Sequence, residues 1–263
     1  LRGLALVAAV LEFYFFMKIR EQPYLQTPEA EKGGGIGVLL IPLKDRKYLA
    51  TASVAFLWTF ATAIIGSYYS VYLLQDLKIS YAFLSSLSVV AVPLSIIFTP
   101  VWAGIIRRTS WLRALYMAMF FYAFAYLGNV FVTAKTALIV YPAIVVWCYL
   151  FSPGVSLVFS NLPYLKMPES GRTAYLGFYS TVNSLASVLG AYLGTLIITA
   201  TPDLKLKLFG FTMVNKQYIN LLQFALILGI AFYVRALQRR DAAKETAESD
   251  KAKEKLVEAG SIE

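Results

Sequence analysis

Residues 137–160 read ALIVYPAIVVWCYLFSPGVSLVFS, an apolar run of 24 residues without one charged side chain. A helix needs about 20 such residues to cross the roughly 30 Å hydrocarbon core of a bilayer. The rest of the chain has the same character, because 59% of its 263 residues are apolar and 15% are charged. Soluble domains contain about a quarter charged residues, so this composition favours lipid as the solvent of the helices.

Six further apolar stretches bring the prediction to about seven transmembrane helices in an all-α integral membrane protein. They cover residues 1–17, 49–74, 81–104, 112–132, 174–199 and 219–237. Residues 18–48 contain Pro23, Pro28, three consecutive glycines and mixed charges, which predicts a linker that separates one helix from the other six. Residues 1–17 end in aromatic residues, are followed by Lys18, Arg20 and Glu21, and lack the small-residue cleavage site of a signal peptide. We interpret them as the end of a truncated spanning helix, and the chain as a fragment.

The basic residues predict how the helices are oriented. Eighteen of the 24 Lys and Arg residues fall on the side of the linker and the C-terminal tail, and five fall on the other. Cytoplasmic loops carry such an excess, so the linker and residues 238–263 are expected in the cytoplasm. Pairs such as Glu248 with Lys251 also allow this charged tail to continue the last helix.

The residue types that are missing exclude several classes of function. The chain has no histidine and a single cysteine, Cys148. This argues against histidine-based catalysis, against zinc sites with several cysteine or histidine ligands, and against a disulfide framework. The net charge of +9 does not indicate a nucleic-acid partner, because the basic residues lie between apolar blocks rather than along one face. No cofactor or metal is expected.

Serine and threonine are distributed unevenly over the last six helices. Residues 112–132 and 219–237 contain none, whereas each of the other four helices contains at least three. The six helices therefore form two triplets, each with two polar helices followed by one that we expect to face lipid. A 3+3 pattern is typical of the inverted repeats in one half of a transporter.

Two short loops carry a resemblance to a known family. Gly104-Ile105-Ile106-Arg107-Arg108 is a glycine-plus-basic motif between two helices, and residues 167–172, MPESGR, form a Glu/Pro/Arg loop. With the helix pattern, they make the chain resemble the C-terminal half of a major facilitator superfamily transporter.

The resemblance implies a domain organisation and a function. Residues 1–17 would be the last helix of the N-terminal half, 18–48 the cytoplasmic interdomain linker, 49–237 the six-helix C-terminal half, and 238–263 the tail. The protein would be a secondary active transporter of the plasma (inner) membrane that moves a small solute by alternating access. Its partners would be the solute, the bilayer and the missing N-terminal half.

Two helices carry periodic faces of small, polar and aromatic residues that are candidates for a solute-binding cavity. Trp58, Thr62 and Tyr69 share one face of the helix at 49–74, and Tyr179 and Asn183 share one face of the helix at 174–199. Aromatic rings could stack on a solute that hydroxyl and amide groups orient. Packing between helices is the alternative for these faces, and it is the preferred one for the Gly190/Gly194 pair.

Three further features bear on the site. Trp147 precedes Pro153 and Gly154, and we expect this pair and Pro93 to break or bend their helices. Trp147 then faces either the cavity or lipid. Glu12 is the only acidic residue within a predicted span, which makes it a candidate for the coupling ion. Its position near Lys18 also allows it to reach the membrane surface instead.

Two other classes of protein fit the sequence less well. A seven-helix receptor matches the number and orientation of the helices, but a long cytoplasmic linker sets one helix apart and no cysteine pair can join its outer loops. An intramembrane enzyme would need paired carboxylates, a Ser/Lys pair or metal ligands within the membrane. We therefore predict a transporter and no enzymatic activity.

Overall fold

The computed structural model describes residues 41–168, 171–201, 206–208 and 211–260, together with residues 10, 14, 15, 17 and 18. The chain divides into two compact units, Leu1–Val38 and Leu39–Glu263, and all elements discussed below belong to the second. Most of the predicted first helix at 1–17, including Glu12, and of the linker at 18–48 lies outside the described residues.

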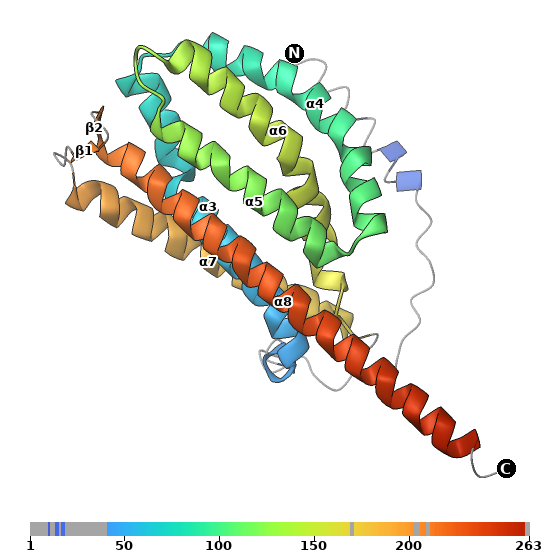
Figure 1. Ribbon diagram of the computed structural model, residues 1–263. Helices are drawn as coiled ribbons and strands as arrows, with labels where there is room; N and C mark the ends of the chain where they lie inside the picture. Colours follow the sequence, from blue (N-terminus) through green and yellow to red (C-terminus); the bar gives the residue numbers. More distant parts are fainter. Residues whose placement is uncertain are drawn as a thin grey trace. The chain divides into compact units, whose positions relative to one another are not determined.

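Long helices account for almost all of the second unit, as Figure 1 shows. They are α3 (Arg46–Val71), α4 (Tyr81–Arg108), α5 (Trp111–Val130), α6 (Ala137–Asn161), α7 (Arg172–Ala200) and α8 (Asn215–Gly260). Each begins within four residues of a predicted helix. Among the described residues, five are long and apolar enough to span a bilayer, and α5, with 20 residues, is a sixth long helix. The all-α membrane class is confirmed.

Short elements join the long helices. They are the 3₁₀ helix η2 (Ile41–Lys44), the π-helical turn η3 (Tyr72–Asp76), the 3₁₀ helix η4 (Leu162–Tyr164), and strands β1 (Leu206–Leu208) and β2 (Phe211–Met213). The two strands form one small antiparallel hairpin, in which Lys207 is opposite Thr212. This hairpin occupies the loop between α7 and α8 and leaves the fold class unchanged.

Side-chain caps explain where three helices begin. The carboxylate of Asp45 accepts hydrogen bonds from the backbone N–H groups of Lys47 and Tyr48, at 2.9 and 3.1 Å. The hydroxyl groups of Ser80 and Ser110 cap α4 and α5 in the same manner. Each cap satisfies N–H groups that have no partner within the helix. The helix boundaries are therefore encoded locally.

The expected breaks at proline are not found, although the prediction allowed a bend as well. Pro93 lies inside α4 and Pro153 lies inside α6, and both helices continue through them. Neighbouring helices can satisfy backbone groups that proline leaves free within a membrane. Pro153 leaves the carbonyl group of Tyr149 without its helical donor. At the neighbouring residue, the indole Nε1 of Trp102 on α4 donates to the carbonyl oxygen of Leu150, at 2.8 Å.

The order in which the helices contact one another is symmetric between the two triplets, α3–α5 and α6–α8. The main contacts are α4 with α6, α6 with α5, α5 with α8, α8 with α3, and α3 with α7. The contacts thus form the series α4–α6–α5–α8–α3–α7. Replacing each helix by its equivalent in the other triplet (α3 by α6, α4 by α7, α5 by α8, and the reverse) gives the same series read backwards. The two triplets are therefore equivalent in their packing, as a pair of inverted repeats would be.

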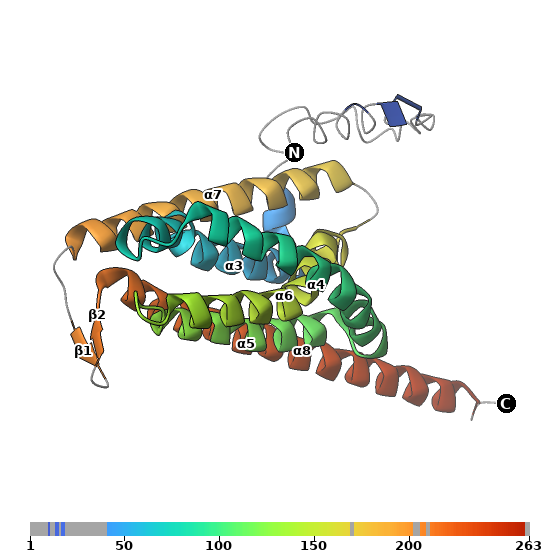
Figure 2. The ribbon, with the colours of Figure 1, turned by 90° about the horizontal axis from the view of Figure 1, so that it is seen from above.

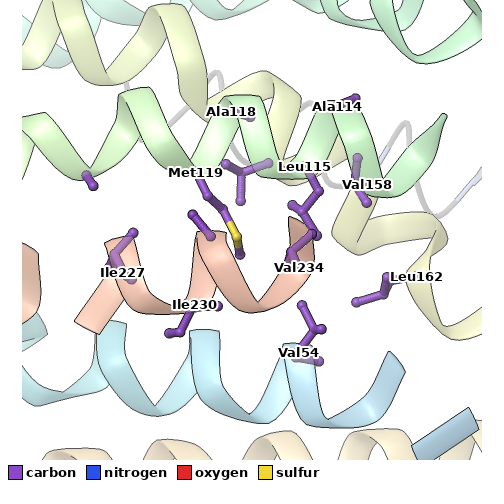
Figure 3. Packing of buried hydrophobic residues seen from close by; sticks show 14 of the residues in the cluster. Val54, Ala114, Leu115, Ala118, Met119, Val158, Leu162, Ile227, Ile230 and Val234 are labelled. Atoms are coloured by element: carbon purple, nitrogen blue, oxygen red, sulfur yellow. The ribbon is translucent and has the colours of Figure 1, made fainter. Parts of the chain in front are cut away.

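The contact between α5 and α8 is the most extensive in the unit. Figure 3 shows side chains of α5 and α8 pointing toward one another beside α3, among them Leu115, Met119 and Ile227. Beyond this core α8 extends past the other helices toward the C-terminus, which Figure 2 shows from above. The tail thus continues the last helix as far as Gly260.

The expectation that the third helix of each triplet faces lipid is wrong for much of its surface. Alanines 114, 118 and 123 of α5 are fully buried, and they allow neighbouring helices to approach closely. The absence of hydroxyl groups therefore did not indicate a lipid-facing helix. Phe124 and Phe232 do remain 39% and 48% exposed.

Candidate functional site

Large aromatic side chains fill the space between α3 and α6. The ring of Trp58 lies 5.5 Å from that of Phe159, nearly parallel to it, and 5.8 Å from that of Tyr122 on α5. Near the C-terminal end of α3 a second aromatic contact reaches α6, with 6.3 Å between the ring centroids of Tyr69 and Tyr141. We call these five side chains the aromatic interface. All of them are half-buried, so part of each ring remains accessible.

Polar groups accompany these rings within the membrane-spanning region. The Tyr69 hydroxyl donates to Oδ1 of the buried Asn129, at 2.8 Å. The Tyr122 ring lies 5.7 Å from that of Tyr126 in a T-shaped arrangement, and Cys148 packs in the same cluster as Tyr69 and Tyr141. Aromatic faces with hydroxyl, amide and thiol groups at their edges can bind a solute by stacking and hydrogen bonding.

Thr62 shares the face of α3 that carries Trp58 and Tyr69. Its hydroxyl donates to the backbone carbonyl oxygens of Trp58 and Thr59, at 2.9 and 3.1 Å. The same oxygen still has lone pairs free, so Thr62 can accept a hydrogen bond from a solute.

The opposite side of α3 packs directly on α7 through small residues. A Cβ atom at Gly190 would lie 2.4 Å from the carbonyl oxygen of Phe60, and one at Gly194 would lie 2.0 Å from that of Ile64. We call this contact, with Ala63 beside Gly190, the glycine interface. The assignment of the glycine pair to helix packing is confirmed.

Tyr179 and Asn183 belong to the α7 face that meets α3. Asn183 Oδ1 accepts a hydrogen bond from the Thr59 hydroxyl, at 3.1 Å, and the Tyr179 side chain interacts with Asn183. Tyr179 also packs against the same core as Trp58. These two predicted site residues therefore adjoin the aromatic interface but engage α3 itself.

Trp147 lies elsewhere on α6, and its Nε1 donates to the carbonyl oxygen of Phe121 on α5 at 2.8 Å. It lines an apolar hollow of about 620 Å³ together with Phe120, Phe124 and residues of α6. The structure thus brings Trp58, Thr62 and Tyr69 to one face of α3, places Tyr179 and Asn183 beside it, and leaves Trp147 apart.

The carboxylates of the described residues lie outside the aromatic interface. Asp45 caps α3, Asp76 pairs with Lys216, and Asp241 pairs with Lys166. The aromatic interface itself consists of neutral side chains. The candidate coupling residue, Glu12, lies outside the described residues.

A row of buried amides on α8 was missed in the sequence. Gln217, Asn220 and Gln223 are at most 3% exposed, and Gln223 Nε2 donates to the carbonyl oxygen of Ala61 on α3 at 3.0 Å. Gln217 Nε2 donates to the Val130 carbonyl, at 2.9 Å. Their spacing of three residues was the available signal, but the prediction that this helix faces lipid rested on its lack of serine and threonine.

Comparisons with known proteins identify the family. The family model described as Major Facilitator Superfamily matches residues 3–191. The comparisons with curated proteins and with solved structures found no match. The matched region includes α3, α4, α5, α6 and most of α7. The chain therefore belongs to the major facilitator superfamily, a family of membrane transporters.

Proposed function

We propose that this protein is a secondary active transporter that moves a small solute across the membrane by alternating access, with α3–α8 as one of its two halves. One observation carries the proposal: the packing order α4–α6–α5–α8–α3–α7 is its own reverse when the two triplets are exchanged. Inverted repeats of this kind place solute sites near the midplane of the bilayer, where equivalent helices of the repeats meet.

The aromatic interface is the proposed solute-binding region of this half. α3 and α6 are equivalent in the packing order, and their rings face each other through Trp58 and Phe159 and through Tyr69 and Tyr141. We assign solute contact to Trp58, Thr62 and Tyr69. Tyr179 and Asn183 would position α7 against α3, so that the two helices move together when access changes sides. The counterpart surface would come from the other half of the transporter.

A neutral, aromatic and hydroxyl-bearing surface suits a polar, uncharged or weakly charged solute. Fixed charges that would hold a strongly ionic solute are missing from the described part of the interface. Rings and hydroxyl groups give orientation at a low desolvation cost. Glu12 remains the proposed coupling residue, and the linker and tail are proposed to lie on the cytoplasmic side of the plasma membrane.

Transport in proteoliposomes tests the proposal. The purified transporter with both of its halves would be reconstituted into vesicles, which would be incubated with a mixture of small metabolites, washed and analysed by mass spectrometry. We expect at least one polar solute to accumulate in a manner that depends on an ion gradient. Protein-free vesicles are the control. Retention equal to that control for every solute would contradict a transport function and favour a receptor.

A further inference from the structure

Three arginines converge between α5 and α8 at the end of the bundle from which the tail extends. Arg113 lies in the first turn of α5, while Arg235 and Arg239 are one turn apart on α8. Together with Tyr116, Met117 and Gln238 they line a hollow of about 280 Å³, which we call the arginine pocket. The pocket lies within the most extensive helix contact of the unit.

The positive charge of this pocket has no carboxylate partner within the described residues. The ion pairs described there join Lys166 to Asp241 and Lys216 to Asp76, and both lie outside the pocket. Arg235 is held by a neutral group, because its Nη1 donates to the Tyr116 hydroxyl at 3.1 Å and its guanidinium lies over the Tyr116 ring. Three like charges in one hollow repel each other unless an anion joins them.

A row of aromatic rings leads from this pocket along α5 and α8. Tyr116 lies 6.0 Å from Phe120 and 6.4 Å from Phe232, and Phe120 lies 5.5 Å from Phe124. Phe120 and Phe124 also line the apolar hollow of about 620 Å³ beside Trp147. A charged pocket is thus continuous with an apolar surface that is partly exposed.

We propose that the arginine pocket binds the phosphate of an anionic phospholipid, whose acyl chains lie along the aromatic row and in the apolar hollow. Guanidinium groups bind phosphate oxygens in pairs of parallel hydrogen bonds, and basic pockets between membrane helices attract anionic headgroups. A free anion would use the pocket alone. The adjoining apolar row selects a lipid.

This binding would strengthen the contact between α5 and α8. The pocket has walls from both helices, so a bound headgroup joins their ends and stabilises the folded state by mass action. The proposal requires only that these helices lie in a bilayer, and it does not depend on which solute the protein transports.

The first test compares three additives on the purified full chain in a neutral detergent. Short-chain phosphatidylglycerol, short-chain phosphatidylcholine and inorganic phosphate would be added at equal concentrations. Thermal unfolding and native mass spectrometry would then be measured. We expect phosphatidylglycerol alone to raise the unfolding midpoint and to remain bound. An equal effect of phosphate would indicate a general anion site, and an equal effect of phosphatidylcholine would show that the arginines are irrelevant; either result would overturn the proposal.

The second test uses matched arginine variants. Arg235→Gln and Arg239→Gln each remove one charge from the pocket, and each should weaken phosphatidylglycerol binding about fivefold. Arg107→Gln and Arg108→Gln change exposed arginines in the last turn of α4, outside the pocket, and should leave affinity unchanged.

The variant series tests whether the arginine pocket binds lipid even if one variant is unstable. Arg239 is exposed, so Arg239→Gln is expected to fold even if Arg235→Gln does not. Arg235→Lys keeps the charge and should retain most of the binding. If Arg239→Gln binds the lipid as the natural chain does, or if the α4 variants lose affinity equally, the pocket is not a lipid site.

Discussion

The two sides of α3 contact their neighbouring helices in different ways. Toward α7, glycines allow the backbones to approach so closely that an added Cβ would meet a carbonyl oxygen at 2.0 Å. Toward α6, the rings of Trp58, Phe159, Tyr69 and Tyr141 keep the helices apart, with centroids 5.5 and 6.3 Å from each other. The first contact leaves no room for a ligand, whereas the second consists of side chains that can change rotamer.

This difference indicates which contacts of α3 can move. Close packing of backbones resists displacement, because interiors at crystal-like density tolerate few voids. Rings can be displaced by a solute that offers an equivalent stacking surface. We therefore expect α3 and α7 to move as one body and the aromatic interface to open and close.

The largest expected effect comes from filling the glycine interface. Gly194→Ala places a methyl group against the Ile64 carbonyl, so the helices must separate and the protein should lose about 3 kcal/mol of stability. Gly66→Ala is the matched control on the other side of α3, where a Cβ would have no atom within 4 Å. Unfolding by denaturing detergent measures both.

The comparison fails if the two glycine variants behave alike. Equal stability of Gly194→Ala and Gly66→Ala would mean that α3 and α7 are not in close contact. A loss confined to Gly66→Ala would reverse the roles of the two sides.

The next effect concerns transport. Trp58→Ala removes the ring that stacks on Phe159, and we expect uptake per folded molecule to fall about tenfold, equivalent to about 1.4 kcal/mol. Trp147→Ala removes the same side chain from the separate hollow and should change uptake by less than about twofold. The assay is uptake of the solute that the vesicle screen identifies. Equal losses in the two variants would deny the aromatic interface a special role.

The smallest effect sharpens the assignment of Asn183. A double-mutant cycle with Thr59→Val and Asn183→Ala isolates the 3.1 Å hydrogen bond between α3 and α7. We expect a coupling of about 0.6 kcal/mol in stability, typical of such bonds in membranes, with uptake per folded molecule unchanged. A large loss of uptake with unchanged stability would instead make Asn183 a solute ligand.

Local features of this fold were readable from the sequence, and features that depend on packing partners were not. Apolar length predicted each long helix, and the spacing of Gly190 and Gly194 predicted a packing face. The burial of α5 was missed because alanines 114 and 118 serve equally in lipid and against a helix. The amides of α8 were missed because Gln223 acquires its role only when Ala61 of α3 is adjacent.

The candidate site was predictable only in part for the same reason. Periodicity placed Trp58, Thr62 and Tyr69 on one face of a helix, and in the structure they lie on one face of α3. It did not reveal that Phe159 and Tyr141 come from α6 to meet them, because a single helix contains no information about its partner. Trp147 is an example, because the residues around it in the sequence are compatible with either a cavity-facing or a lipid-facing position on α6.

Cysteine accessibility at adjacent positions tests alternating access at the aromatic interface most directly. Thr62→Cys and Ala63→Cys, each with Cys148→Ala, place one thiol on the aromatic side and one on the glycine side of α3. A membrane-impermeant thiol reagent would be applied to right-side-out and to inside-out vesicles. We predict that Thr62→Cys reacts in both preparations and Ala63→Cys in neither. Reaction of Thr62→Cys from one face only, or equal reaction at both positions, would contradict the account.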